Sequence, residues 1–283
     1  MRIGIIGAGK VGTSIGFALK QKGMEITAIS DLLEEPLGTT RKYLGSGVRY
    51  TLNSLEVVEA SDAIAVTTQD RAIKDVAAAI ADKAGNLEGK LFFHTSGAHP
   101  ASLLKPLDAK GARLGALHPL QTFPDIDSAI KVLPTTYIFI EGEESSIGAL
   151  RTIGKTIGFD VVEIEGKDKV LYHLSAVFVC NLLCALLYTG EKIMDKIGIE
   201  FQPFLPIIKA TLANIESKGP LMSLTGPVVR GDVETVLSHL EAMKDMELYK
   251  KAYKALSLVA VEVAEEKGGL SEEAIEKLKQ ALV

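Results

Sequence analysis

The spacing of apolar residues changes once along the chain, near residue 165. Before that point, short apolar runs typical of buried strands alternate with stretches at helical spacing. The runs lie at 2–6, 26–29, 48–51, 62–67, 90–94, 114–117, 136–141 and 161–164. Beyond residue 166 the spacing is helical throughout, and helices are expected at 168–197, 203–217, 232–243, 247–267 and 271–282. The pattern predicts an α/β fold: a doubly wound sheet over 1–165, followed by an all-α domain over 166–283.

A glycine-rich turn joins the first apolar run to the first helical stretch, and it predicts dinucleotide binding. Its residues are Gly7, Ala8, Gly9, Lys10, Val11 and Gly12. The first glycine permits a tight turn, the second lets the backbone approach a pyrophosphate, and the third lets the helix pack closely on the sheet. The free N–H groups at the amino end of the helix would then face the phosphates. The alternative is a glycine-rich turn in an α/β protein without this ligand.

Asp31 ends the second run, nineteen residues after Gly12. A carboxylate there accepts hydrogen bonds from the ribose hydroxyls and repels a 2′-phosphate, so NAD is favoured over NADP. Arg41 and Lys42 are the nearest cations and leave NADP open. Asp31 could instead cap the next helix. Thr67 and Thr68 end the fourth predicted strand, at the sheet edge where such cofactors bind.

Composition excludes several classes of protein. The 283 residues are 47% hydrophobic, enough for two domains with a sizeable core, and the net charge of −5 argues against nucleic-acid binding. Cys180 and Cys184 alone form neither a zinc site nor a disulfide framework, so no metal is expected. The chain begins in a strand and shows no signal peptide, which favours the cytoplasm.

One segment resembles a membrane span. Residues 170–190 contain no charged side chain, and they are numerous enough to cross a bilayer. The run includes His173, Ser175, Asn181 and Tyr188, and no second run like it occurs. A buried helix of a soluble protein, rather than a membrane span, is therefore expected.

Polar residues follow two successive strands at the predicted ligand edge. His94, Thr95 and Ser96 end one strand; His118, twenty-two residues after Ser96, ends the next. Adjacent strands would bring Ser96 and His118 together, where the pair could relay a proton during hydride transfer. The alternatives are a loop histidine braced by Pro119 and a simple turn at Ser96. His94, within its strand, is interpreted as structural.

Two further groups are candidate substrate ligands. His173 and Asn181 share one side of the long helix, opposite Leu171, Leu174, Phe178, Leu182 and Leu186. Such polar groups need a partner, either a ligand or an internal hydrogen bond. Arg230, in the segment 224–232, could bind a carboxylate or phosphate, or be a surface arginine near a helix cap at Asp232.

These stretches carry a resemblance. The segments 94–98, 115–123 and 224–232, with Tyr172-His173 and Asn181, resemble Rossmann-like proteins of uncharacterised function. Their C-terminal domain is similar to the helical domains of 6-phosphogluconate dehydrogenase, pyrroline-5-carboxylate reductase and prephenate dehydrogenase. Resemblance to the prephenate dehydrogenases implies that Ser96 and His118 serve the substrate hydroxyl. The lysine-and-asparagine helix motif of hydroxyacid dehydrogenases is not cleanly present, although Lys169 lies near its place. The resemblance also implies a homodimer joined through the helical domain.

Together these observations predict an NAD(P)-dependent oxidoreductase that transfers hydride to or from a small acidic metabolite bound between the two domains. His118 and Ser96 would be catalytic, and His173, Asn181 and Arg230 would bind substrate. The alternative is a non-catalytic protein that binds a dinucleotide and reports its level to a partner. That sensor would use the glycine turn and would not need the polar side chains.

Overall fold

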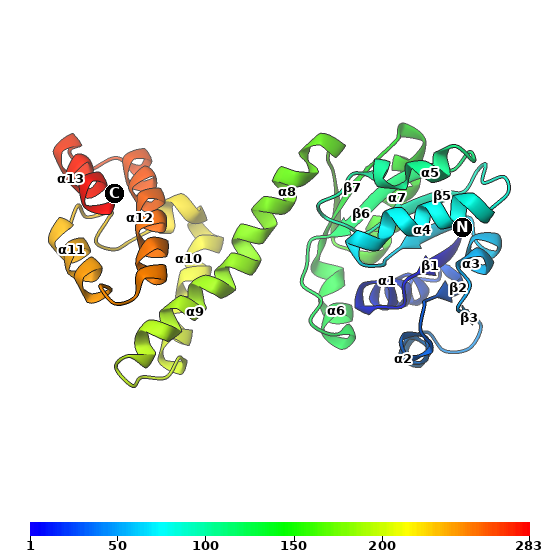
Figure 1. Ribbon diagram of the computed structural model, residues 1–283, viewed down its shortest axis with the longest axis horizontal. Helices are drawn as coiled ribbons and strands as arrows, with labels where there is room; N and C mark the ends of the chain where they lie inside the picture. Colours follow the sequence, from blue (N-terminus) through cyan, green and yellow to red (C-terminus); the bar gives the residue numbers. More distant parts are fainter. The chain divides into compact units, whose positions relative to one another are not determined.

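The computed structural model describes all residues, 1–283 (Figure 1). By contacts between Cα atoms, the chain divides into two compact units, Met1–Asn181 and Leu182–Val283. The first holds the whole sheet, and the second is helical. The domain boundary near residue 165 stays a prediction, because the helix that begins after it belongs to both units.

An eight-stranded sheet forms the centre of the first unit. Its order is β3-β2-β1-β4-β5-β6-β7-β8. The first six strands are parallel, and β7 pairs antiparallel with β6. The order reverses between β1 and β4, where ligands bind in open α/β sheets. The fold class is thereby confirmed. The strands are β1 (Arg2–Ile6), β2 (Glu25–Ser30), β3 (Arg49–Thr51), β4 (Ala63–Val66), β5 (Leu91–His94), β6 (Arg113–Pro119), β7 (Tyr137–Gly142) and β8 (Asp160–Glu163).

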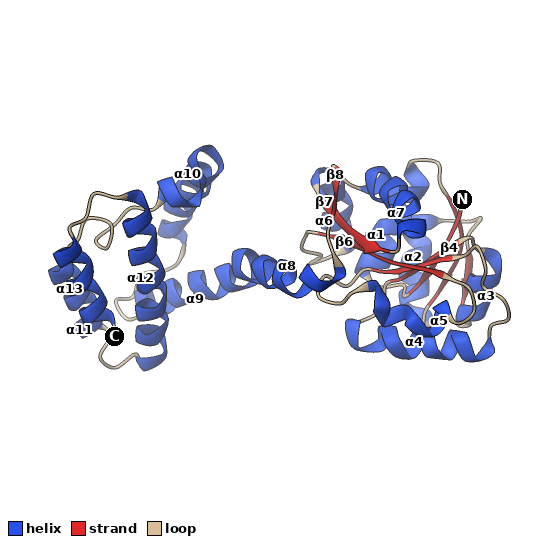
Figure 2. Ribbon diagram, turned by 90° about the horizontal axis from the view of Figure 1, so that it is seen from above, coloured by secondary structure: helices blue, strands red, loops and turns tan.

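Helices cover both faces of this sheet, as Figure 2 shows. On one face α1 packs with α2, α6 and α7, and on the other α4 packs with α3 and α5. Because both faces are covered, most strand residues are buried and their sequences are nearly continuous apolar runs. The helices are α1 (Lys10–Gln21), α2 (Glu34–Leu44), α3 (Ser54–Ala60), α4 (Asp70–Lys83), α5 (Lys105–Asp108), α6 (Ile126–Val132) and α7 (Glu144–Ile157).

Two elements of this unit differ from the predicted pattern. Strand β6 continues to Pro119, so His118 lies within the strand, where it pairs with Phe139. Pairing with the antiparallel strand β7 extends β6 beyond the apolar run 114–117 from which the strand was predicted. Helix α6 was not predicted; it is only seven residues long and is capped by Asp125, whose Oδ1 accepts from the N–H of Ser128 at 2.7 Å.

A long helix leaves the first unit. It consists of α8 (Lys169–Ala176), a π-helical turn η4 (Val177–Asn181) and α9 (Leu182–Asp195). The expectation of a buried helix is wrong for the single chain: Leu171 is 66% exposed and Phe178 58%. By length and composition this is also the one helix that could span a bilayer, which is weak support for a membrane location.

The second unit contains no strand, as predicted. A small core of apolar side chains, among them Val236, Val261 and Leu278, joins its last three helices. Asp232 and Ser271 cap two of them, accepting from the N–H groups of Thr235 and Ala274 at 3.0 and 3.2 Å. Its further helices are α10 (Leu205–Ser223), α11 (Val233–Ala242), α12 (Glu247–Lys267) and α13 (Glu272–Leu282).

Candidate functional site

The glycine turn between β1 and α1 is held closely against the end of β4. Gly7 has a φ of +109°, which favours glycine. A Cβ on Gly12 would lie 2.2 Å from the carbonyl oxygen of Gly7, so only glycine fits there. Thr67 Oγ1 donates to that same carbonyl at 2.7 Å. The turn therefore has a fixed shape, set by its glycines and by Thr67.

The amino end of α1 is open for an anion. Its N-cap, Gly9, has no side chain to cap the helix, and a Cβ there would meet nothing within 4 Å. The backbone N–H groups of Gly9, Lys10 and Val11 form no hydrogen bond. The ammonium of Lys10 is directed elsewhere, to the carbonyl of Pro124 at 2.6 Å. Unbonded N–H groups at a helix start, with free space before them, fit a diphosphate.

A pocket of about 660 Å³ lies beside this turn. Its lining includes two buried hydroxyls without a hydrogen-bond partner, Ser30 Oγ and Thr68 Oγ1. Buried polar groups without a partner are costly, so these two point to a ligand that supplies one. The other polar or glycine residues that line the pocket are Gly7, Gly9, Asp31, Ser54, Thr67, Gln69, Arg71 and Asp75.

Asp31 stands between the turn and the pocket. Its Oδ2 accepts from the N–H of Ala8 at 2.8 Å, and its Oδ1 accepts from the N–H of Leu33 at 3.2 Å. The carboxylate is thus held by two backbone N–H groups, it lines the pocket, and each oxygen can accept a further hydrogen bond. Arg41 lies over the ring of Tyr50 at 4.8 Å, and Arg71 is the cation that lines the pocket. The structure therefore brings together the predicted cofactor residues from β1, β2 and β4.

Ser96 follows β5 and is tied to the start of α4. Its Oγ donates to Asp70 Oδ2 at 2.7 Å and accepts from the N–H of His99 at 3.3 Å. Ser96 and His118, which were predicted to pair, form no hydrogen bond with each other. Since Asp70 directly follows residues that line the pocket, Ser96 connects the glycine-turn site to the next strand end.

His94 holds the turn that contains Ser96. Its Nδ1 accepts from the N–H of Ser96 at 3.2 Å, which leaves the proton on Nε2 for the carbonyl of Pro100 at 3.0 Å. The side chain is fully buried, and burial lowers its pKa to about 4. These contacts account for both ring nitrogens and agree with the structural interpretation of His94.

Lys169, the first residue of α8, reaches the same turn. Its Nζ donates to the carbonyl of Ser96 at 2.8 Å, and the residue is 1% exposed. Burial lowers its pKa to about 8, against the attraction of Glu141 and Asp70. Lys169 therefore holds the turn through this hydrogen bond and brings a positive charge next to it.

His118 forms the second polar group, with aromatic neighbours. Its Nδ1 lies 2.6 Å from the hydroxyl of Tyr172, whose ring stacks on Phe139 at 4.2 Å between centroids. Burial, followed by the positive charge of Lys169, lowers the pKa of His118 to about 4. Burial also raises the pKa of the Tyr172 hydroxyl. Both groups are therefore neutral at physiological pH.

Gly97 brings the Ser96 turn and His118 together. A Cβ on Gly97 would lie 2.9 Å from Cε1 and Nε2 of His118 and 2.7 Å from Cδ2 of His173. The rings of His118 and His173 are 6.4 Å apart between centroids. Ser96 and His118 thus lie at one edge of the sheet, as predicted, and His173 lies beside them, although no hydrogen bond joins the three.

The remaining predicted substrate ligands lie elsewhere. Asn181 ends the π-helical turn η4 and is exposed, with no hydrogen bond from its side chain. Arg230 belongs to the second unit, where it is exposed and precedes the cap at Asp232. Their roles stay predictions.

Three residues at the site were given no role by sequence reasoning: Asp70, Lys169 and Tyr172. Asp70 could have been found, because it follows Thr67-Thr68-Gln69 at the ligand edge. Tyr172 and Lys169 contact residues 54 and 73 positions away, and no local pattern signals such contacts.

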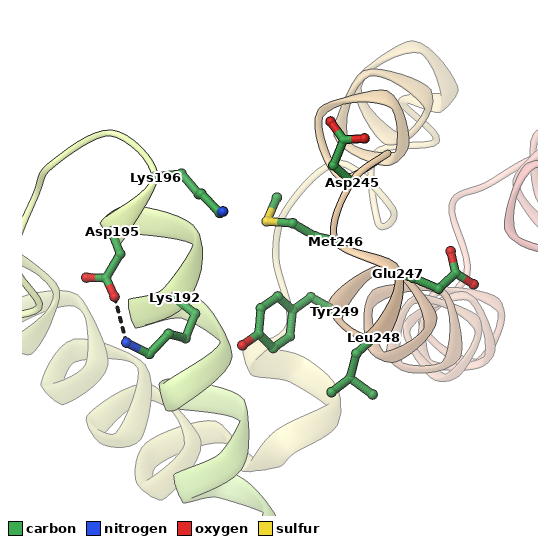
Figure 3. A pocket seen from close by; sticks show the side chains of 8 residues that line it. All are labelled: Lys192, Asp195, Lys196, Asp245, Met246, Glu247, Leu248 and Tyr249. Carbon is green, nitrogen blue, oxygen red and sulfur yellow. Dashed lines mark hydrogen bonds and ion pairs between the residues drawn. The ribbon is translucent and has the colours of Figure 1, made fainter.

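The second unit has a hollow of its own, drawn in Figure 3. It lies between α9 and the start of α12, and Lys192 pairs there with Asp195 at 2.7 Å. The charged side chains at this hollow are accessible to solvent, and no buried polar atom there lacks a hydrogen-bond partner. Buried polar groups that a ligand could complete lie in the first unit.

Comparisons with known proteins agree with this architecture. A Rossmann-like domain matches residues 1–119, and a domain of unknown function, DUF2520, matches residues 136–260. None of the curated proteins matches the sequence.

Solved structures resemble nearly the whole chain. A Bacteroides fragilis protein provisionally named an NADP oxidoreductase is 25% identical, with a TM-score of 0.73 over 90% of this chain and 96% of that one. A Thermotoga maritima protein is 24% identical, with a TM-score of 0.75 over 94% and 99%. A reductive aminase from Aspergillus terreus, in complex with NADPH and ethyl-5-oxohexanoate, is 16% identical, with a TM-score of 0.67 over 99% and 92%.

The last two likenesses show the fold alone. The two family matches together span most of the sequence and follow the same order as the two structural classes, sheet first and helices second. The chain therefore combines a Rossmann-like domain with a DUF2520 domain, in that order.

Proposed function

We propose that the protein is an NAD(P)-dependent oxidoreductase that transfers hydride to or from a small acidic metabolite. The observation that carries the proposal is the open amino end of α1 next to a buried polar cluster. Asp70 joins the two, because it follows the pocket-lining residues and holds Ser96 at 2.7 Å. Similarity to a protein named as an NADP oxidoreductase supports the same class.

Different residues of the chain bind the cofactor and the substrate. The N–H groups at the start of α1 hold the diphosphate, and Asp31 accepts hydrogen bonds from the adenosine ribose. Ser30 and Thr68 offer their unpartnered hydroxyls to the same ligand. When bound, the nicotinamide supplies or accepts the hydride. His118 orients the substrate through a hydrogen bond, and Lys169, Asp70 and Ser96 fix the turn beside it.

His173, Asn181 and Arg230 are proposed substrate ligands. His173 is supported by its place against Gly97, next to His118. Arg230 is supported by its exposed guanidinium, which suits the carboxylate of an acidic metabolite.

NAD is the cofactor that we propose. The carboxylate of Asp31 faces the pocket, and Glu34 and Glu35 open the helix that follows, so a 2′-phosphate would meet negative charge. The relatives solved with NADPH make NADPH the alternative. Parallel titrations with NADH and NADPH decide between them.

We further propose a cytoplasmic homodimer. The exposed apolar side of α8 and α9 needs cover, and a second copy would supply it without a membrane. Light scattering of the purified protein should give twice the mass of 30.3 kDa. A monomer that requires detergent would contradict both parts.

The function is tested by binding followed by turnover. Fluorescence titration with NADH and NADPH comes first; a screen of 2-oxo acids, imines and hydroxy acids follows. We expect one candidate to be oxidised or reduced by the wild-type protein. In His118→Gln this turnover should be lost while cofactor binding is retained. Binding without turnover of any candidate would favour the dinucleotide sensor instead.

A further inference from the structure

We infer that Tyr172 holds His118 in the tautomer that carries its proton on Nε2, so that His118 meets its ligand as a neutral hydrogen-bond donor. The catalytic meaning of this inference rests on the proposed function. The tautomer itself is a property of the protein alone and can be measured without a substrate.

The geometry joins three elements around one ring. His118 projects from β6, and its neighbour in the register, Phe139, projects from β7. Tyr172 comes from α8, stacks on Phe139 and meets the His118 ring edge-on, with 80° between the planes. The hydroxyl then lies 2.6 Å from Nδ1. Stacking on Phe139 and the edge-on contact with His118 together position the hydroxyl for this hydrogen bond.

The direction of the bond follows from the two groups. Tyr172 has no other acceptor for its proton among the hydrogen bonds, and Nδ1 of His118 has no other partner. A phenol O–H is a stronger donor than a neutral imidazole N–H, and a neutral imidazole nitrogen is a good acceptor. Tyr172 therefore donates and Nδ1 accepts. In a neutral imidazole the remaining proton must then be on Nε2.

Nε2 is the edge of the ring that a ligand can approach. It borders Gly97, where a Cβ would lie only 2.9 Å away, and it has no hydrogen-bond partner in the chain. Lys169 donates to the adjacent carbonyl of Ser96, so its positive charge opposes a second proton on the ring. The absence of a side chain at residue 97 leaves the Nε2–H unobstructed.

The inference specifies what His118 does. It would polarise an acceptor, such as a carbonyl oxygen or imine nitrogen, through a hydrogen bond whose proton stays on Nε2. Tyr172 would be a positioning residue, since it acts through His118. A histidine that instead served as a charged acid would need a proton on both nitrogens, which the Tyr172 bond and Lys169 both disfavour.

Two-bond ¹H–¹⁵N correlation spectra of histidine-labelled protein test the tautomer directly. The chain has five histidines, and His118→Gln identifies the signal of His118 by its disappearance. We expect an Nε2–H pattern at neutral pH in the wild type and a shift toward mixed tautomers in Tyr172→Phe. An Nδ1–H or doubly protonated ring, or an unchanged His118 signal in Tyr172→Phe, would overturn the inference.

The chain offers a matched control. The hydroxyl of Tyr253 lies 2.9 Å from Nδ1 of His239, in an equally edge-on arrangement within the second unit. Tyr253→Phe should alter the His239 signal and leave His118 as it is. If turnover is found, Tyr172→Phe should lower kcat about tenfold without changing the KM for the dinucleotide. If no turnover is found, the spectra still decide the inference.

Discussion

The hydroxyl of Ser96 donates to the carboxylate of Asp70 at 2.7 Å, and thereby connects two strand ends that are separate in the sequence. Asp70 opens α4, directly after the residues that line the glycine-turn pocket. Ser96 is 3% exposed, and its turn is held further by Lys169. This arrangement predicts that Ser96 orders the site, whereas the sequence alone predicts that it relays a proton to His118.

Ser96→Ala should therefore cost less activity than His118→Gln. Loss of a hydrogen-bond donor that polarises the substrate is expected to slow turnover by roughly 10²–10³-fold. Loss of the Ser96 hydroxyl leaves Asp70 with an unmade hydrogen bond and should slow turnover by roughly tenfold. Steady-state kinetics of the two variants, with exposed His99→Gln as the control, measure the difference. An equal loss of turnover in the two variants would contradict this prediction and favour a proton relay between Ser96 and His118.

Gly9→Ala and Gly12→Ala should separate binding from folding. A Cβ at Gly9 meets nothing in the chain, so the variant should keep its melting temperature and bind dinucleotide at least tenfold more weakly. A Cβ at Gly12 collides with the Gly7 carbonyl, so that variant should unfold at a lower temperature. Thermal melts and fluorescence titrations give both quantities. Unchanged affinity in Gly9→Ala would contradict the placement of the diphosphate.

Asp31→Ser should shift cofactor preference toward NADPH. The substitution removes a negative charge and the acceptor of ribose hydrogen bonds, so NADH affinity should fall on the order of tenfold while NADPH affinity rises. Asp82→Ser, on the exposed side of α4, is the matched control. An unchanged ratio of the two dissociation constants would remove Asp31 from the ribose site.

The first unit should lose stability in acid through its buried histidines. The pKa of His94 is about 4 in the folded protein against 6.5 for the free side chain. Between these values the unfolded chain binds more protons, so the free energy of unfolding falls as the pH falls, by about 3 kcal/mol for a shift of this size. Urea unfolding at pH 7 and pH 4.5 measures the slope.

His99→Gln should keep most of that slope, because His94 stays buried in this variant. Nuclear magnetic resonance titration of the wild type provides a second measurement that needs no substitution at His94. A His94 ring that titrates near 6.5 in the folded protein would contradict the explanation.

Local pattern was sufficient for most of the fold. Apolar runs located all eight strands, and the turn at Gly7–Gly12 with Asp31 located the pocket, because strand, turn and acid are neighbours through the sheet. The end of β6 was misplaced, since its last residues are held by pairing with β7 rather than by an apolar run.

Contacts between distant segments account for what pattern did not predict. The partner of Ser96 is Asp70 and the partner of His118 is Tyr172, and each pair joins elements whose packing no spacing rule specifies. The exposed side of α8 and α9 has a similar cause. An apolar helix face predicts burial, but the sequence does not say whether the cover comes from the same chain or from another copy.

The central claim is that the amino end of α1 holds the diphosphate of a nicotinamide dinucleotide. Isothermal titration of the wild-type protein with NADH, and separately with NADPH, tests it most directly. The account predicts binding of one dinucleotide per chain, weakened at least tenfold in Gly9→Ala. No heat with either dinucleotide up to millimolar concentration would contradict it.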